Sequence, residues 1–87
     1  MNQPRPSTKP PVRIFPTEQF KRHRDSALNA TEYRGLLLVL GHDTRCGKPV
    51  EGIPGVRALD FAGCIIHYYP AADYTTIHLL NIEKVDW

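Results

Sequence analysis

The chain has 87 residues, of which 41% are hydrophobic and 23% charged, and its formal net charge is +2. This length forms one small domain, and this composition excludes a disordered chain and a membrane protein. Cys46 and Cys64 are too few for a disulfide framework, and the longest apolar run, residues 36–40, is too short to cross a bilayer. We therefore expect a cytoplasmic protein with reduced thiols and no membrane partner.

Residues 1–11 form a Pro-rich segment that we expect to be a flexible leader, because its four prolines fix φ and lack N–H donors. Residues 1–24 contain six Lys or Arg residues and one acidic residue, whereas residues 25–87 contain five basic and eight acidic residues. Such a basic arm suits a polyanion or an acidic protein partner, or it only aids solubility. Residues 12–87 are expected to form a single domain.

A short strand and a first helix are predicted after the leader. Residues 12–15, with the sequence VRIF, are apolar and β-branched enough for a strand, and Pro16 ends it. The Thr17 side chain can accept a hydrogen bond from a free amide of the next turn. A helix is therefore predicted from Glu18 to about Leu28.

A second helix is predicted to begin at Asn29, because Glu32 three residues later completes a variant of the capping box. An apolar stripe follows at the spacing of a 3.6-residue period, and it consists of Tyr33, Leu36, Leu37 and Leu40. Gly41 is the natural left-handed stop for this helix, and the residues after it are predicted to form a loop.

The second half of the chain has the composition of β-strands. Residues 57–61 (RALDF), 64–69 (CIIHYY) and 75–82 (TTIHLLNI) are separated by short links, which predicts an antiparallel meander. The sequence predicts an α+β domain of order β-α-α-β-β-β, with two helices packed on one face of a mainly antiparallel four-stranded sheet. The predicted core consists of Leu36, Leu37, Leu40, Ile66 and Leu80.

Side chains alternate along the middle strand of this meander. Cys64, Ile66 and Tyr68 face one way and Ile65, His67 and Tyr69 the other, and one of these two faces is predicted to carry the helices.

Four stretches in residues 32–84 resemble the RelE/ParE superfamily of bacterial toxins, and more closely its RelE/HigB-like members. They are a helix with EYRGLL, a Gly- and Pro-rich loop that ends in an arginine (DTRCGKPVEGIPGVR), the strand CIIHYY, and an apolar strand with a late lysine (IHLLNIEK). The resemblance implies the toxin of a type II toxin–antitoxin system that cleaves messenger RNA on the ribosome without a metal or cofactor. Its implied partners are a cognate antitoxin, the ribosome and mRNA.

The resemblance also implies site residues. The catalytic candidates are Arg57, Lys84, His67 and Tyr68, and the RNA-binding candidates are Lys48, Arg57, Tyr69 and Lys84. Attack of a ribose 2′-hydroxyl on phosphate needs a base, an acid and cations for the developing charge. A guanidinium can hold two phosphate oxygens, a tyrosine can stack on a base, and an imidazole can exchange protons near neutral pH.

The chain departs from the family pattern at three places. Asp60 stands where relatives have a second basic residue, residues 62–63 replace a longer basic loop, and Cys64 stands where an arginine is common. One alternative is therefore a non-catalytic protein-interaction module or inhibitor that binds a protein partner, either a degenerate toxin or a protein from a phage or mobile element. A ParE-like gyrase inhibitor is a further alternative. The alternative to phosphate contact by Arg57 is an ion pair with Asp60 or Glu51.

Overall fold

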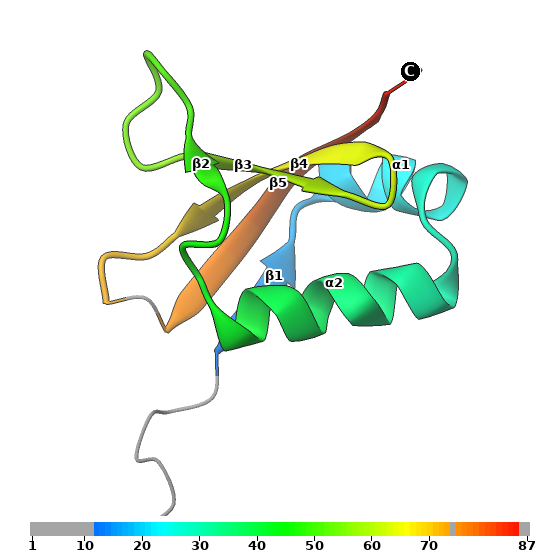
Figure 1. Ribbon diagram of the computed structural model, residues 1–87, viewed down its shortest axis with the longest axis horizontal. Helices are drawn as coiled ribbons and strands as arrows, with labels where there is room; N and C mark the ends of the chain where they lie inside the picture. The colour runs from blue at the N-terminus through cyan, green and yellow to red at the C-terminus, as the bar shows by residue number, and fades with distance from the viewer. Residues whose placement is uncertain (1–11, 74, 86–87) are drawn as a thin grey trace, which may run out of the picture.

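The computed structural model describes residues 12–73 and 75–85, so the predicted leader, residues 1–11, lies outside the described residues. Figure 1 shows how the helices and a curved sheet are arranged. The elements in chain order are β1 (Arg13–Pro16), α1 (Glu18–Ala27), α2 (Ala30–His42), β2 (Lys48–Pro49), β3 (Arg57–Phe61), β4 (Cys64–Pro70) and β5 (Thr76–Lys84). No helix in the described part is long and apolar enough to span a membrane.

Both helices begin at the caps that the sequence predicts. The Thr17 hydroxyl accepts a hydrogen bond from the Phe20 N–H at 3.3 Å at the start of α1. At the start of α2 the Glu32 N–H donates to the Asn29 side chain at 2.7 Å, and the Asn29 N–H donates to the Glu32 carboxylate at 2.9 Å. The predicted capping box is therefore confirmed, and it satisfies amides that would otherwise lack a partner.

The prediction that Gly41 ends α2 is wrong. The helix continues to His42, and Asp43 is its C-cap, with an N–H that donates to the Val39 carbonyl at 3.0 Å. Gly41 does not adopt a left-handed backbone, and a methyl group on its Cα would meet no atom within 4 Å. The position is therefore an ordinary exposed helical site occupied by a glycine.

Replacing Gly41 with Ala is expected to raise the free energy of unfolding by about 0.5–1 kcal/mol, because Ala loses less backbone freedom than Gly in a helix. Urea denaturation followed by circular dichroism measures the change. Gly63→Ala is the matched control, since Gly63 is equally open but has φ of +75°, where Ala is strained. A loss of stability in both variants would contradict the helical assignment of Gly41.

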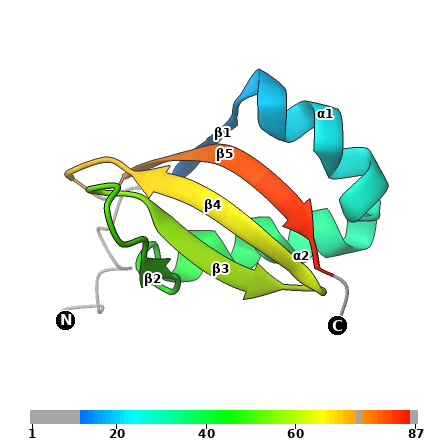
Figure 2. The same cartoon turned by 90° about the horizontal axis from the view of Figure 1, so that it is seen from above.

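The sheet has five strands in the order β1-β5-β4-β3-β2, rather than the predicted four (Figure 2). The strand β1 runs parallel to β5, and the other pairs are antiparallel. The additional strand, β2, has two residues and pairs Lys48 with Ala58 inside the segment that was predicted as loop. A strand of two residues is too short to show the alternation of apolar and polar side chains by which a strand is recognised, so the sequence does not predict it.

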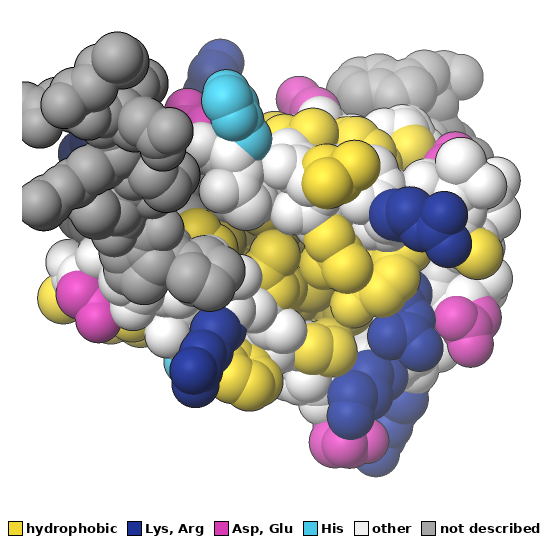
Figure 3. Space-filling view, turned by 90° about the horizontal axis from the view of Figure 1, so that it is seen from below, with side chains coloured by type: hydrophobic (Ala, Val, Ile, Leu, Met, Phe, Trp, Pro, Cys, Tyr) yellow, Lys and Arg dark blue, Asp and Glu magenta, His cyan; other side chains and the backbone are white. Residues whose placement is uncertain are grey.

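The core lies between one face of the sheet and the two helices. Phe20 from α1 and Leu36 and Leu40 from α2 join one buried cluster with the β4 residues Cys64, Ile66 and Tyr68 and the β5 residues Ile77, Leu79 and Ile82. This confirms the α+β class and the predicted alternation of β4. The outer surface of α2 keeps apolar side chains in solvent, and Figure 3 shows them on the face that carries this helix.

Three of the five predicted core residues, Leu36, Leu40 and Ile66, are fully buried, and Leu37 is partly buried against the cluster. The prediction for Leu80 is wrong. In the pairing of β4 with β5, His67 lies opposite Asn81 and Tyr68 opposite Leu79, so a bulge passes over Leu80. Its neighbour Leu79 takes the buried position, and Leu80 is only half-buried.

Candidate functional site

The predicted site residues Arg57 and Tyr68 hold the loop that leads into β2. They are direct partners on β3 and β4, and both reach the peptide groups of Gly47. The Gly47 N–H donates to the Tyr68 hydroxyl at 2.9 Å, and the Arg57 Nη1 donates to the Gly47 carbonyl at 2.6 Å. These two bonds, which we call the Gly47 clamp, connect the loop to two neighbouring strands.

Only glycine fits at position 47. A methyl group there would lie 2.7 Å from the Ala58 carbonyl oxygen and 2.9 Å from the Tyr68 ring. Sequence reasoning missed this residue, because a glycine in a loop rich in Gly and Pro is unremarkable by pattern. In sequence, Gly47 is 10 positions from Arg57 and 21 from Tyr68. A local sequence pattern does not reveal contacts between residues so far apart.

Tyr68 is fully buried, and burial raises the pKa of its hydroxyl to about 12. The phenol therefore stays neutral near pH 7 and serves as the acceptor for Gly47, with the Cys46 sulfur 3.9 Å away. A hydroxyl in this position does not reach a substrate, so the geometry supports a structural contact rather than the predicted catalytic one.

Arg57 does not form the ion pair with Asp60 or Glu51 that was the alternative to phosphate contact. Asp60 lies three residues further along β3 and therefore on the opposite face of the strand. Among the described residues, the ion pairs are Lys21–Glu18 and Arg24–Asp25, both exposed at least in part. Neither Asp60 nor Glu51 neutralises Arg57, and a guanidinium has five N–H donors, of which the bond to Gly47 uses one.

Arg57 and Tyr69 line the same groove, which has a volume of about 310 Å³ and which we call the Arg57 groove. The Tyr69 side chain is 40% exposed, and its ring lies against Gly55. Lys48 neighbours the Arg57 groove, because it precedes the groove residue Pro49 in β2. The structure thus brings together two of the predicted residues in the groove, a partly buried cation and an exposed aromatic ring, while Lys48 is next in sequence to the groove residue Pro49.

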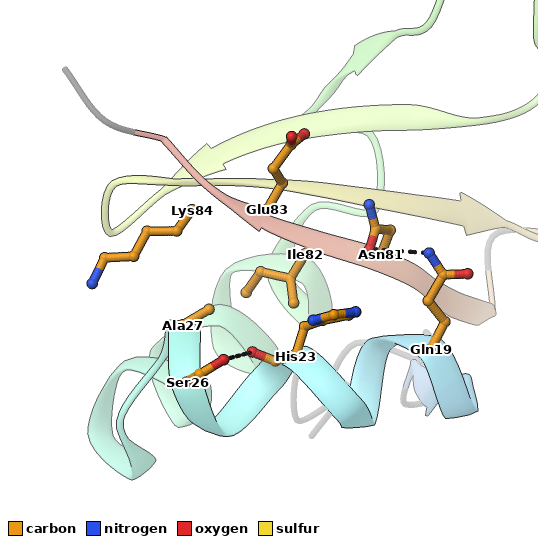
Figure 4. A pocket seen from close by; sticks show the side chains of 8 residues that line it. All are labelled: Gln19, His23, Ser26, Ala27, Asn81, Ile82, Glu83 and Lys84. Carbon is orange, nitrogen blue, oxygen red and sulfur yellow. Dashed lines mark hydrogen bonds between the residues drawn. The ribbon is translucent and has the colours of Figure 1, made fainter.

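Lys84 and His67 lie away from the Arg57 groove. On β4, Lys84 pairs with Cys64 and Arg57 pairs with Tyr68. These two β4 positions are four residues apart, so Lys84 and Arg57 are separated by about 13 Å along the strands. The Lys84 side chain lines a separate pocket of about 510 Å³ between α1 and β5, together with His23 and Ser26 (Figure 4). His67 is half-buried on the other face of the sheet. The four predicted catalytic residues therefore do not form one cluster.

The sheet face opposite the helices is not a basic surface in the described part of the chain. Asp60 and Glu83 pair with Ile65 from the two neighbouring strands, so both carboxylates lie on this face. Lys48, on the edge strand β2, is aligned across β3 with His67 and lies on the same face. Within residues 12–73 and 75–85, no three His, Cys, Asp or Glu side chains are grouped as metal ligands. A polyanion on this face would therefore meet carboxylates as well as cations.

No protein-family model and no curated protein matches the chain. Solved structures do match. A chain of the RelBE2 toxin–antitoxin complex of Mycobacterium tuberculosis superposes with a TM-score of 0.68 at 18% identity, over 85% of this chain and 98% of that one. A chain of the E. coli RelBE toxin–antitoxin complex has a TM-score of 0.68 at 13% identity, over 87% and 99%. The isolated E. coli RelE toxin also has a TM-score of 0.68 at 13% identity, over 87% and 86%. The protein therefore has the fold of the RelE toxins.

Proposed function

We propose that the protein is a RelE-like toxin that acts in the cytoplasm, is neutralised by a cognate antitoxin, and cleaves messenger RNA on the ribosome without a metal. The observation that carries this proposal is the Arg57 groove, in which an arginine and an exposed tyrosine lie together on a RelE fold. The fold match extends over nearly the full length of two toxin–antitoxin complex chains, which supports the same kind of antitoxin partner.

Each residue near the Arg57 groove has a distinct role in the proposed reaction. The Arg57 guanidinium binds phosphate oxygens and stabilises the charge that develops when a ribose 2′-hydroxyl attacks the adjacent phosphate. This attack forms a 2′,3′-cyclic phosphate and breaks the bond between phosphorus and the 5′-oxygen of the next nucleotide, which leaves with a proton as a 5′-hydroxyl. The Tyr69 ring stacks on a base, and Lys48 neutralises a neighbouring phosphate. Lys84 and His67 were predicted to be catalytic, but they lie away from the Arg57 groove, and we propose that they contact RNA further along its path instead.

A second candidate function is a RelE-fold protein that binds a protein partner without catalysis. Asp60 and Glu83 on the open sheet face favour this candidate, because carboxylates beside an RNA path repel phosphate. The Gly47 clamp favours it as well, since it gives Arg57 a structural role by holding the Gly47 carbonyl.

Induction of the wild-type chain in a bacterial host is expected to arrest growth and produce new 5′ ends in mRNA, mapped by primer extension. Tyr69→Ala and Lys48→Ala should reduce cleavage, with roughly a tenfold or greater loss for Tyr69, because stacking on a base contributes about 1–3 kcal/mol. Both side chains are exposed, so the fold should be retained. Arg22→Ala, an exposed cation on α1, is the matched control and should cleave normally.

Normal growth and intact mRNA with the folded wild-type chain would reject the nuclease function and leave the protein-binding candidate. Growth arrest with intact mRNA and broken chromosomal DNA would instead indicate a ParE-like gyrase inhibitor.

A further inference from the structure

Three side chains with rings form a row across the sheet face opposite the helices. Phe15 on β1 pairs with His78 on β5, and His78 pairs with Tyr69 on β4, so all three point to the same side of the sheet. The adjacent residues Tyr68 and Leu79 are buried toward the helices, which places the row on the other side. We call Phe15, His78 and Tyr69 the aromatic row, and Figure 2 shows its three strands side by side.

The aromatic row lies in solvent, although rings of this size could contribute to a core. Phe15 is 49% exposed and Tyr69 is 40% exposed, and the His78 side chain is exposed as well. The rings of Phe15 and His78 are stacked, with their centres 6.0 Å apart and their planes at 27°. Phenylalanine is among the residue types that are most often buried. Rings that gather in solvent on adjacent strands are therefore better explained by a ligand than by folding.

The aromatic row begins at the Arg57 groove. Tyr69 lines this groove together with Arg57, and from there the row crosses β5 to the edge strand β1, a span of roughly 10 Å. An RNA strand with one phosphate at Arg57 can therefore continue across the sheet with its next bases over the rings. RNA-binding sheets commonly stack two or three bases on aromatic side chains of neighbouring strands. The position and the length of the row both fit such a strand.

The charges near the aromatic row suit a phosphate backbone. Arg13 is exposed and lies two positions before the row's residue on β1, on the same side of the strand. It adds a cation at the end of the row that is farthest from Arg57. Stacking on rings between two cations is the usual arrangement for single-stranded nucleic acid.

The carboxylates of this sheet face lie away from the aromatic row. Asp60 and Glu83 both pair with Ile65, which is four residues from the row's position on β4 and thus about 13 Å along the strand. This distance exceeds the screening length of about 8 Å at physiological ionic strength. In the turn before β5, the Asp73 carboxylate accepts a hydrogen bond from the Thr75 N–H at 3.0 Å. A strand that crosses the sheet along the row therefore avoids the carboxylates of β3 and β5.

We propose that the aromatic row binds successive bases of a single-stranded RNA by stacking, next to the phosphate held in the Arg57 groove. The inference rests on the proposed function, because the messenger RNA cleaved at the Arg57 groove is the strand that would cross the row. It adds Phe15 and His78 to the RNA-binding residues and gives the strand β1 a part in substrate binding.

Two synthetic strands of eight units test the proposal, and fluorescence anisotropy at one fixed salt concentration measures their binding to the full chain. One consists of 2′-O-methyluridines, and the other has the same sugar–phosphate backbone without bases. Neither has the 2′-hydroxyl that cleavage requires. The uridine strand is expected to bind at least tenfold more tightly, because the two strands carry equal charge but only one can stack on rings.

Variants of Phe15 and His78 locate the binding. Phe15→Leu and His78→Leu should each weaken binding of the uridine strand at least fivefold and leave binding of the strand without bases unchanged, because they remove a ring but no phosphate contact. Phe15→Trp and His78→Phe keep a ring and should bind like the wild type or more tightly. The control is Leu38→Ala, which removes a 69% exposed side chain on the outer surface of α2 and should change neither affinity. Circular dichroism verifies that each variant is folded.

Equal binding of the two strands, binding of neither, or full binding of the uridine strand by Phe15→Leu and His78→Leu would overturn the proposal. It would also be overturned if the wild type bound the uridine strand only after deletion of residues 1–11, because the row would then belong to the chain's own leader. Neither strand can be cleaved, so binding is measured independently of cleavage. A chain that cleaves mRNA without using the row, or binds at the row without cleaving mRNA, separates the failure of this inference from that of the proposed function.

Discussion

Replacing Leu36 with Ala is expected to lower the free energy of unfolding by about 2–5 kcal/mol, a large part of the stability of so small a domain. Leu36 is fully buried where α2 meets the sheet, so its removal leaves a cavity that the surrounding side chains close only in part. Urea denaturation measured by circular dichroism gives the change.

Leu37→Ala is the matched control, because Leu37 is adjacent on the same helix but only partly buried. Its loss should be clearly smaller, since less apolar area returns to water. An equal or greater loss for Leu37 would mean that α2 is rotated about its axis relative to the arrangement described above.

Replacing Gly47 with Ala is expected to destabilise the protein by about 1–3 kcal/mol through overpacking, and by about 1 kcal/mol more for each hydrogen bond of the Gly47 clamp that breaks. The new methyl group would lie 2.7 Å from a backbone carbonyl of β3, which cannot move without disturbing its strand. A thermal melt measures the loss, and Gly41→Ala, with open space at the same atom, serves as the control.

Tyr68→Phe separates the two causes of this loss. It leaves the shape of the site nearly unchanged but removes the acceptor of the buried Gly47 N–H, which costs about 1–3 kcal/mol when the amide is left without a partner. If Gly47→Ala and Tyr68→Phe both melt like the wild type, the loop before β2 does not close against β4 in solution.

The sequence predicted the elements whose causes are local. The caps at Thr17 and Asn29 act on amides three residues away, so the starts of both helices follow from short patterns. Alternation in residues 64–69 correctly separated the buried side chains of β4 from those that are half-buried or exposed. Gly41 was misassigned because a glycine stops a helix only where the backbone turns left-handed, and the residue type does not reveal its φ.

The features that the sequence could not predict depend on contacts between distant segments. Leu79 and Leu80 are equally apolar, and only the bulge in the pairing with β4 decides which of them is buried. The same limit applies to the candidate site. The resemblance proposed Arg57, Tyr69 and Lys84 together, but strand register places Lys84 at the other end of the sheet. Gly47 was missed because its importance comes from two strands that follow it in the chain.

The sheet topology constrains how the domain is built during synthesis. The strand β5 comes last of the five described strands, yet it lies between β1 and β4, and β1 has its parallel pairing with β5 alone. The start of α1 also depends on β5, since the Thr17 N–H and hydroxyl donate to the Leu79 and Leu80 carbonyls. Until β5 has left the ribosome, β1 has no strand to pair with and Phe20 lacks part of its core. A nascent chain that ends before Thr76 is thus unable to assemble this fold, so any activity that needs the folded domain begins only after β5 has been made.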